Sequence, residues 1–340
     1  MRFIDTLNGM RHDPPPIWIM RQAGRYLPEY KRVRQTTSDF ISFCLDPEKA
    51  TEVTLQPIKR YGFDASIIFS DILLIPWAMD RNVQFITGKG PVLDKLVSVK
   101  DIEHFAETDL TIKYKAVGEA VHQTRAHLPE DTALIGFSGA PWTLMTYLFE
   151  GGSSRDFAAT KSYLWSHPDE TVACIEILVK KIIEFLTLQA KSGANALMLF
   201  DSWASAVPAS WRDKLIIQPH QKIIETLRQR SIDLPVICFP KGLGEGLVAY
   251  ADRVEASCIA LDQHTDPVWA HKNLRADLPV QGNLDPLCLV AGGDQLKKEV
   301  SRILDCFADR PHIFNLGHGV VPQTPPEHVQ DLIDLVRNGR

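Results

Sequence analysis

Short apolar stretches recur eight times along the chain, and this repetition limits its possible folds more than any other feature. Their apolar residues are continuous rather than alternating, which is typical of strands that are buried on both faces. The stretches are Pro16–Met20, Ser66–Ser70, Leu134–Ser138, Ala196–Phe200, Val236–Phe239, Cys258–Leu261, Val280–Gly282 and Ile313–Leu316.

Segments with helical spacing of apolar residues separate these stretches. Examples are Pro47–Tyr61, Thr171–Ser192 and Gln218–Gln229. Strands that alternate with helices predict a parallel sheet. Eight repeats predict that the sheet closes into a (β/α)8 TIM barrel. An open doubly wound sheet is the alternative, but no G-x-G-x-x-G follows the first stretch.

The barrel interpretation assigns residues 1–340 to one α/β domain with loop insertions. A TIM barrel needs about 250 residues, so the excess length predicts insertions. The clearest is Asn82–Asp101, which we interpret as a hairpin around Gly88, Lys89 and Gly90.

The residues that follow the apolar stretches form the candidate site, because TIM-barrel chemistry lies at the carboxyl ends of the strands. They are Arg21, Arg25, Ser70, Asp71, Tyr147, Asp201, Ser202, Lys241, Asp262, Asn283, Asp285 and His318. Among them we interpret Asp201, Lys241, Asp262 and Asp285 as structural rather than catalytic.

The loop after the first stretch combines two arginines with a glycine. Arg21 and Arg25 enclose Gly24, and Pro28 predicts a helix that begins there. Guanidinium groups match carboxylates and phosphates in bidentate geometry. The local positive charge contrasts with a net charge of −5 for the chain. The loop is therefore a candidate clamp for a polyanion, and a solvated basic surface is the alternative.

Four other candidates each have a structural alternative. Asp71 lies in an otherwise apolar stretch and either binds a ligand or caps the next helix. His318 lies between two glycines, which allow close backbone approach. Tyr147 follows a helix start at Pro141 and is otherwise a core tyrosine, while Ser202 is otherwise a cap.

Composition excludes several classes of protein. The amino-terminal residues lack the apolar core of a secretory signal, and no apolar run is long enough to span a membrane. Mild acidity argues against nucleic-acid binding. Six scattered cysteines without C-x-x-C or H-x-C predict free thiols in a cytoplasmic protein, with neither disulfides nor a zinc site.

Seven motifs carry a resemblance to the uroporphyrinogen decarboxylase family. They are MRQAGRYLPEY (20–30), TLQPIKRY (54–61), IIFSDIL (67–73), GFSGAPWTLMTYLFEGG (136–152), LFDSWAS (199–205), QGNLDP (281–286) and NLGHG (315–319). They occur in the family's order and span nearly the whole chain. The resemblance implies a TIM barrel, a homodimer, no cofactor or metal, and conversion of the four acetate arms of uroporphyrinogen to methyl groups, giving coproporphyrinogen.

The resemblance also implies roles for individual residues. Arg21 and Arg25 bind substrate carboxylates, and Asp71 binds the pyrrole N–H groups. The remaining substrate contacts that it implies are Gln22, Ala23, Gly24, Phe40, Tyr147, Ser202 and His318, and Arg34 is a further candidate for carboxylate binding.

The implied chemistry needs an electron sink. Protonation of the pyrrole ring creates a cation, which Asp71 would stabilise in a cleft of low dielectric. Arg21 is the family's candidate proton donor. A guanidinium is a poor acid, so a route through substrate or water is the alternative.

Two other functions stay open, and three positions depart from the family pattern. A corrinoid-linked methyltransferase on the same barrel would need a zinc site with H-x-C, which this chain lacks. A catalytically silent anion-binding protein is the other alternative. Trp77 replaces an expected acid, Asp80 an expected glycine and Gln263 an expected aromatic residue.

Overall fold

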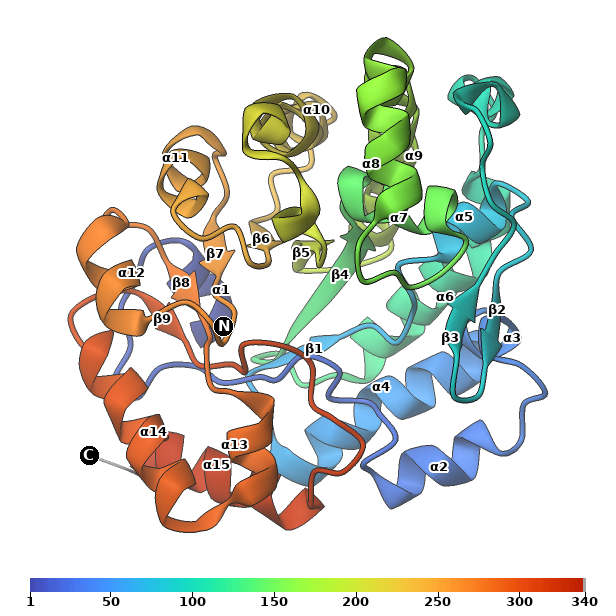
Figure 1. The fold of residues 1–340 in the computed structure, drawn as a ribbon. Coiled ribbons are helices and arrows are strands. Elements are labelled where there is room, and N and C mark those ends of the chain that lie inside the picture. Colours follow the sequence, from blue (N-terminus) through green and yellow to red (C-terminus); the bar gives the residue numbers. More distant parts are fainter. Residues whose placement is uncertain (339–340) are drawn as a thin grey trace.

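A curved sheet of seven parallel strands forms the centre of the computed structural model, which describes residues 1–338 (Figure 1). Every strand pairs with the next in chain order. The strands are β1 (Ala65–Ile67), β4 (Ala133–Gly139), β5 (Ala196–Asp201), β6 (Val236–Pro240), β7 (Cys258–Ala260), β8 (Val280–Gln281) and β9 (His312–Ile313). Seven of the eight predicted strands are therefore confirmed.

The first predicted strand, Pro16–Met20, does not form a ladder, and this part of the prediction is wrong. It makes one isolated parallel bridge, between Ile17 and Phe314. Its backbone nevertheless bonds to both ends of the sheet, because Phe314 N donates to Pro16 O (2.9 Å) and Asp64 N donates to Ile17 O (3.0 Å). Pro16 has no N–H to donate, which limits a regular ladder here. The segment still joins the two edge strands, as a barrel requires.

Helices surround the sheet on its outer side (Figure 1). The larger ones are α4 (Pro47–Tyr61), α6 (Thr111–His127), α9 (Pro168–Lys191), α10 (Gln218–Gln229), α14 (Gly293–Cys306) and α15 (Pro326–Asn338). The shorter ones are α1 (Arg2–Leu7), α2 (Pro28–Arg34), α3 (Phe40–Cys44), α5 (Leu74–Ala78), α7 (Pro141–Glu150), α8 (Ala158–Ser166), α11 (Gly246–Arg253), α12 (Pro267–Asn273) and α13 (Pro286–Ala291). None of these described helices is long and apolar enough to cross a membrane.

The predicted excursion at 82–101 is a hairpin, as expected. Strands β2 (Gln84–Ile86) and β3 (Gly90–Val92) pair antiparallel in a sheet of their own. Gly88 and Gly90 take positive φ angles of 78° and 82°, which suit glycine. Phe85 of the hairpin packs against Phe40 of α3, with ring centroids 4.5 Å apart. The insertion is therefore attached to the segment that follows the arginine loop.

A buried glutamine completes the hydrogen bonding of β4. Strand β1 ends at Ile67, opposite Ile135, so the edge of β4 beyond that point has no neighbouring strand. Gln189 of α9 fills the gap: Phe137 N donates to its Oε1 (2.8 Å), and its Nε2 donates to Phe137 O (2.9 Å). The side chain of Gln189 is fully buried.

We expect Gln189→Leu to lower the free energy of unfolding by about 2–4 kcal/mol, because it leaves a buried N–H and C=O without partners. Urea denaturation followed by circular dichroism measures the change. Gln330→Leu, at an exposed position of α15, is the matched control. Equal midpoints for Gln189→Leu and the wild type would contradict this role.

Candidate active site

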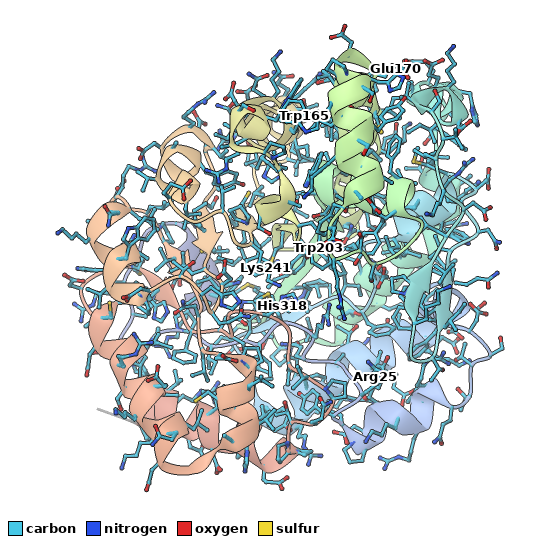
Figure 2. The ribbon with its side chains drawn as sticks, viewed as in Figure 1. Arg25, Trp165, Glu170, Trp203, Lys241 and His318 are labelled. Atoms are coloured by element: carbon cyan, nitrogen blue, oxygen red, sulfur yellow. The ribbon has the colours of Figure 1, made fainter. Side chains whose placement is uncertain are left out.

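The predicted site residues come from different strands and meet at one end of the sheet. Figure 2 shows Lys241 and His318 close together at the centre of the molecule, with Trp203 beside them and Arg25 on the side of α2. Arg21 interacts electrostatically with Asp71, Tyr147, His318 and Lys241. The structure therefore places Arg21 among residues that follow four other strands.

Contacts with the segment that follows β9 hold the backbone around Arg21. Met20 N donates to Asn315 Oδ1 (3.0 Å), and Val320 N donates to Met20 O (2.9 Å). Arg21 has a positive φ of 62°, a conformation that is strained for a residue with a side chain. Gly319 lies directly beneath the Arg21 side chain, where an added Cβ would overlap its Cγ and Cδ. The NLGHG motif thus supports the first arginine.

The rest of the loop combines exposed and buried residues. Arg25 is exposed, while Ala23 and Gly24 are partly buried. Gln22 is fully buried, and its Nε2 donates to Ala65 O (3.2 Å). Its side chain therefore fastens the loop to β1. Arg34, a further carboxylate-binding candidate, instead donates to Thr37 O (2.7 Å) from its Nη1.

Asp71 both caps a turn and faces Arg21. Its Oδ1 accepts a hydrogen bond from Leu73 N (2.8 Å), just before α5. Burial raises the pKa of the Asp71 carboxyl to about 6, although the Leu73 N–H and the charge of Arg21 oppose the rise. Its second oxygen accepts no hydrogen bond from the described residues. The capping and ligand-binding interpretations are thus compatible.

His318 is a neutral group in this cluster at neutral pH. Burial, with the charges of Arg21 and Lys241, lowers the pKa of its imidazole to about 3. The ring stacks on Phe239, with centroids 6.2 Å apart. Its Nδ1 is buried and has no hydrogen-bond partner among the described residues. A neutral imidazole with a spare ring nitrogen can donate or accept one hydrogen bond, depending on its tautomer.

Aromatic side chains line the region around these polar groups. Tyr147 of α7 lies next to Trp203, with ring centroids 6.4 Å apart, and burial raises the pKa of its hydroxyl. Phe40 packs on Phe69 at 5.8 Å. Ser202 is partly exposed beside Trp203. The predicted Tyr147, Ser202 and Phe40 are therefore all partly accessible to a ligand.

Three cations at this end of the sheet, Arg21, Arg25 and Lys241, form no ion pair with a carboxylate of the described residues. Sequence reasoning found the two arginines but set Lys241 aside. It did not single out Trp203 either, because only the fold places this side chain next to Tyr147 and Lys241.

The three aspartates that we interpreted as structural have local partners, although they do not pair with one another. Asp201 accepts a hydrogen bond from Thr143 Oγ1 (2.6 Å). Asp262 accepts one from the backbone of Gly242 (2.7 Å). Asp285 accepts one from Leu287 N (2.8 Å) and caps α13. Among the described residues, no three His, Cys, Asp or Glu side chains are grouped to hold a metal ion.

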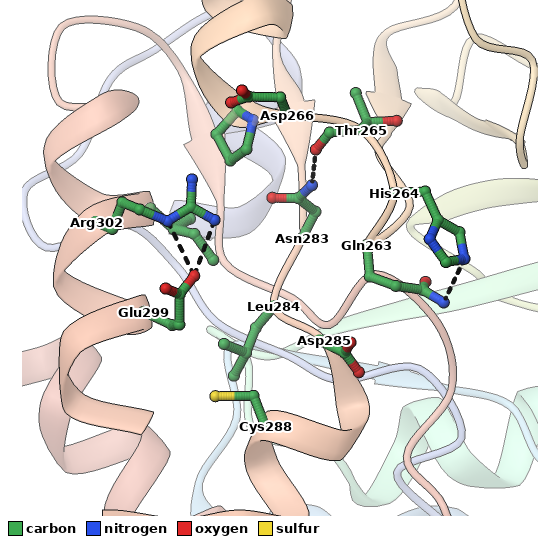
Figure 3. Close-up of a pocket in the computed structure, with 12 residues that line it drawn as sticks. Gln263, His264, Thr265, Asp266, Asn283, Leu284, Asp285, Cys288, Glu299 and Arg302 are labelled. Atoms are coloured by element: carbon green, nitrogen blue, oxygen red, sulfur yellow. Dashed lines mark hydrogen bonds and ion pairs between the residues drawn. The ribbon is translucent and has the colours of Figure 1, made fainter. Parts of the chain in front are cut away.

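A polar cavity of about 490 Å³ is a second candidate site, and neither Arg21 nor Arg25 lines it (Figure 3). The loop after β7 lines it together with α13 and α14. Glu299 and Arg302 pair with each other there at 2.9 Å, and Asn283 Nδ2 donates to Thr265 O (2.7 Å). Because its charged groups are largely paired or capping, this cavity is a weaker candidate site.

The three departures from the family pattern lie at the periphery of the cluster. Asp80 takes a positive φ of 57°, which accounts for the expected glycine, and it pairs with Lys113 (2.6 Å). Trp77 packs partly buried against the core. Gln263 lines the neighbouring cavity and contacts the backbone at Gly317.

Comparisons with known proteins identify the family of this chain. The model of the family described as "Uroporphyrinogen decarboxylase (URO-D)" matches residues 1–339. A protein of Rhodospirillum rubrum with the name uroporphyrinogen decarboxylase is 46% identical over 99% of this chain and 97% of its own length. One from Maricaulis maris is 44% identical, with 98% of this chain and 97% of that protein covered.

Solved structures confirm the type of fold. A methyltransferase from Methanosarcina mazei has a TM-score of 0.83 at 16% identity, with 99% of this chain and 97% of that chain covered. A B12-independent methionine synthase from Shewanella sp. has a TM-score of 0.58 at 10% identity, covering 86% of this chain and 88% of that one. These likenesses show the TIM-barrel scaffold alone, whereas the family match and the close relatives show that this chain belongs to the uroporphyrinogen decarboxylase family, carboxy-lyases of porphyrin biosynthesis.

Proposed function

We propose that the protein removes the four acetate carboxyl groups of uroporphyrinogen III as CO2, leaving methyl groups and producing coproporphyrinogen III, without a cofactor. One observation carries the proposal. Arg21, Arg25 and Lys241 are unpaired cations at the same end of the sheet as Asp71, whose pKa is raised to about 6. An octacarboxylate with N–H groups at its centre complements such a site.

Arg21 and Arg25 bind carboxylate arms in this proposal. Neither guanidinium has an ion-pair partner among the described residues, so both are free to form charge-assisted hydrogen bonds. Gln22, Ala23 and Gly24 hold the loop in position between them, and Gln22 does so through Ala65. The loop therefore orients the substrate through the carboxylate arms at the edge of the macrocycle.

Asp71 accepts hydrogen bonds from the pyrrole N–H groups at the centre of the macrocycle. Its free carboxylate oxygen is suited to this, because Leu73 N occupies only the other one. Protonation of a pyrrole ring makes it a cationic sink for the electrons that CO2 leaves behind. An ionised carboxylate in a site of low dielectric stabilises that cation. The proton comes from Arg21 or through a water molecule. After CO2 leaves, the exocyclic methylene carbon takes up a proton to become the methyl group and the ring carbon loses its added proton, so that one proton is consumed for each CO2.

The other predicted residues complete the cleft. Tyr147 and Ser202 contact the substrate with their hydroxyl groups, and Phe40 lines the apolar side. His318 stays neutral because its pKa is about 3, so it offers a hydrogen bond without adding positive charge. We also propose a homodimer, on the basis of the resemblance alone. Light scattering would give twice the mass of one chain in that case.

The decisive assay incubates the protein anaerobically with reduced uroporphyrinogen III and a metal chelator. Chromatography of the oxidised products should show porphyrins with seven, six, five and finally four carboxyl groups. A protein that binds the substrate without releasing CO2 would be the silent binding protein instead. Activity that the chelator abolishes would contradict the cofactor-independent proposal.

We expect Asp71→Asn to lower kcat by about 100- to 1,000-fold, with a smaller effect on binding, because the amide cannot balance the cationic intermediate. The wild-type kcat/KM should fall about tenfold per pH unit below about pH 6, where Asp71 becomes protonated. Steady-state kinetics over pH 5–9 test both statements. Near-normal turnover by the variant would exclude this role.

The stability of Asp71→Asn provides the control. Because burial raises the pKa of Asp71, the ionised group destabilises the folded state at high pH, and this cost disappears as the pH falls. The variant should therefore be more resistant to urea than the wild type at pH 8. At pH 4 the two should be nearly equal. Loss of activity together with increased stability would separate a functional effect from misfolding.

We expect Gly319→Ala to lower kcat/KM by about 100-fold, because the new methyl group would displace the Arg21 side chain. The flexible arginine can move aside, so stability should change little. Kinetics of Arg21→Ala, Gly319→Ala and the double variant form a double-mutant cycle. If Gly319 acts through Arg21, the double variant will be no worse than Arg21→Ala. Additive losses would contradict the contact.

A further inference from the structure

We propose that Lys241 binds a carboxylate arm of the tetrapyrrole, as a third cationic contact in addition to Arg21 and Arg25. The proposal rests on the function proposed above and names a further residue of the same site. Lys241 follows β6, so it approaches the substrate from a different part of the barrel than the arginine loop does. Sequence reasoning had assigned it a structural role.

The backbone of Lys241 is fixed on both sides. Its N–H donates to Asp201 O (3.1 Å) at the end of β5, and its carbonyl accepts a hydrogen bond from Ser205 N (3.2 Å). The next residue, Gly242, donates its N–H to Asp262 Oδ2 (2.7 Å). These hydrogen bonds fix the direction of the Cα–Cβ bond of Lys241, and a fixed starting direction is useful for a binding residue.

The ammonium group of Lys241 lies within the cluster of site residues. Its Nζ is 6.0 Å from the centroid of the Trp203 ring. Its charge acts on the imidazole of His318, and the charge of Arg21 acts on Lys241 in turn. Figure 2 shows Lys241 and His318 close together at the centre of the molecule.

No carboxylate that the structure describes forms an ion pair with this ammonium group. Asp262 is the acid whose charge acts on it. Both oxygens of Asp262 are engaged with backbone amides: Oδ2 with Gly242 N, and Oδ1 with His264 N (2.8 Å). The geometry therefore commits Asp262 to shaping the loop. Lys241 keeps its hydrogen-bond donors for another partner.

Lys241 in its present surroundings is electrostatically unfavourable. The residue is partly buried, and burial together with the nearby charge of Arg21 lowers the pKa of its ammonium group, although the charge of Asp262 opposes the fall. Arg21 and Lys241 repel each other, and His318, which is neutral at pH 7, does not offset their charge. A bound carboxylate relieves both the desolvation and the repulsion. An anionic ligand is thus the missing partner.

The contact with Trp203 alone does not account for Lys241. Lys214 makes a similar contact with Trp211, with Nζ 5.6 Å from the ring centroid, but it is exposed to solvent. It lies in the turn Asp213–Ile217 that leads into α10, and the nearby Arg212 is paired with Glu245 (2.7 Å). Lys214 is therefore a matched control for the loss of a lysine that lies over a tryptophan.

The carboxylate can belong to an acetate or a propionate arm, since both present the same group. The two arms differ in their fate, because the acetates are lost during the reaction and the propionates remain. Coproporphyrinogen carries only propionates. It therefore reports on the propionate arms as a product inhibitor, whereas uroporphyrinogen reports on both kinds.

The test compares Lys241→Met, Lys241→Arg and Lys214→Met with the wild type under anaerobic conditions. Lys241→Met should raise KM for uroporphyrinogen by about tenfold while kcat changes less, as expected for the loss of a charge-assisted hydrogen bond. Lys241→Arg should retain most of the affinity, and Lys214→Met should behave as the wild type. If coproporphyrinogen inhibition weakens in parallel, the bound arm is a propionate; if it is unchanged, the arm is an acetate.

Two results would overturn the proposal. One is an unchanged KM in a Lys241→Met variant that is folded by circular dichroism. The other is an equal loss of kcat in Lys241→Met and Lys241→Arg with an unchanged KM, which would indicate a role other than carboxylate binding. Should the wild type release no CO2, the proposed function fails, but fluorescence titration with uroporphyrin still tests whether Lys241 binds carboxylates.

Discussion

The junction between the first and last segments of the barrel determines the position of Arg21, which contacts or influences most of the other candidate residues. The Pro16–Met20 segment bonds to Asp64 on one side and to Phe314 on the other, so it closes the gap between β1 and β9. At the end of this segment, hydrogen bonds with Asn315 and Val320 hold Met20. These contacts fix the position of Arg21 at the end of the barrel. They also hold its backbone in the strained conformation with a positive φ.

Arg21 also organises the electrostatics of the site. Its charge opposes the rise in the pKa of Asp71 and contributes to the fall in the pKa of His318. The result is a carboxyl group with a pKa of about 6 and an imidazole that stays neutral, and the charge of the same guanidinium acts on both. Such divergent shifts occur where burial and neighbouring charges act together, and they are typical of functional sites. The unpaired cations would repel one another less with a polyanion bound, so the charge pattern itself selects the class of ligand.

Much of the fold was predictable because proline and apolar continuity mark it directly. Helices α2, α4 and α7 begin at Pro28, Pro47 and Pro141, where the missing N–H costs nothing. The failure of the first strand was not predictable, since the apolar pattern does not reveal that the side chain of Asn315, rather than a backbone carbonyl, accepts the hydrogen bond of Met20 N. Among the site residues, the arginines were found from their local charge. Lys241 was not, because the sequence cannot tell that the oxygens of Asp262 are used by Gly242 and His264.

The likeness to a methyltransferase at 16% identity and a TM-score of 0.83 shows how little of the chemistry resides in the scaffold. The barrel supplies strand ends that meet at one rim, and any function must come from the residues placed there. In this chain those residues are cations without counterions, one acid of raised pKa and one neutral imidazole. A reaction that needs a bound polyanion and a stabilised cation at its centre makes use of all three. In the proposed mechanism, the protonated pyrrole ring accepts the electrons that a cofactor accepts in other decarboxylations, and Asp71 stabilises its charge.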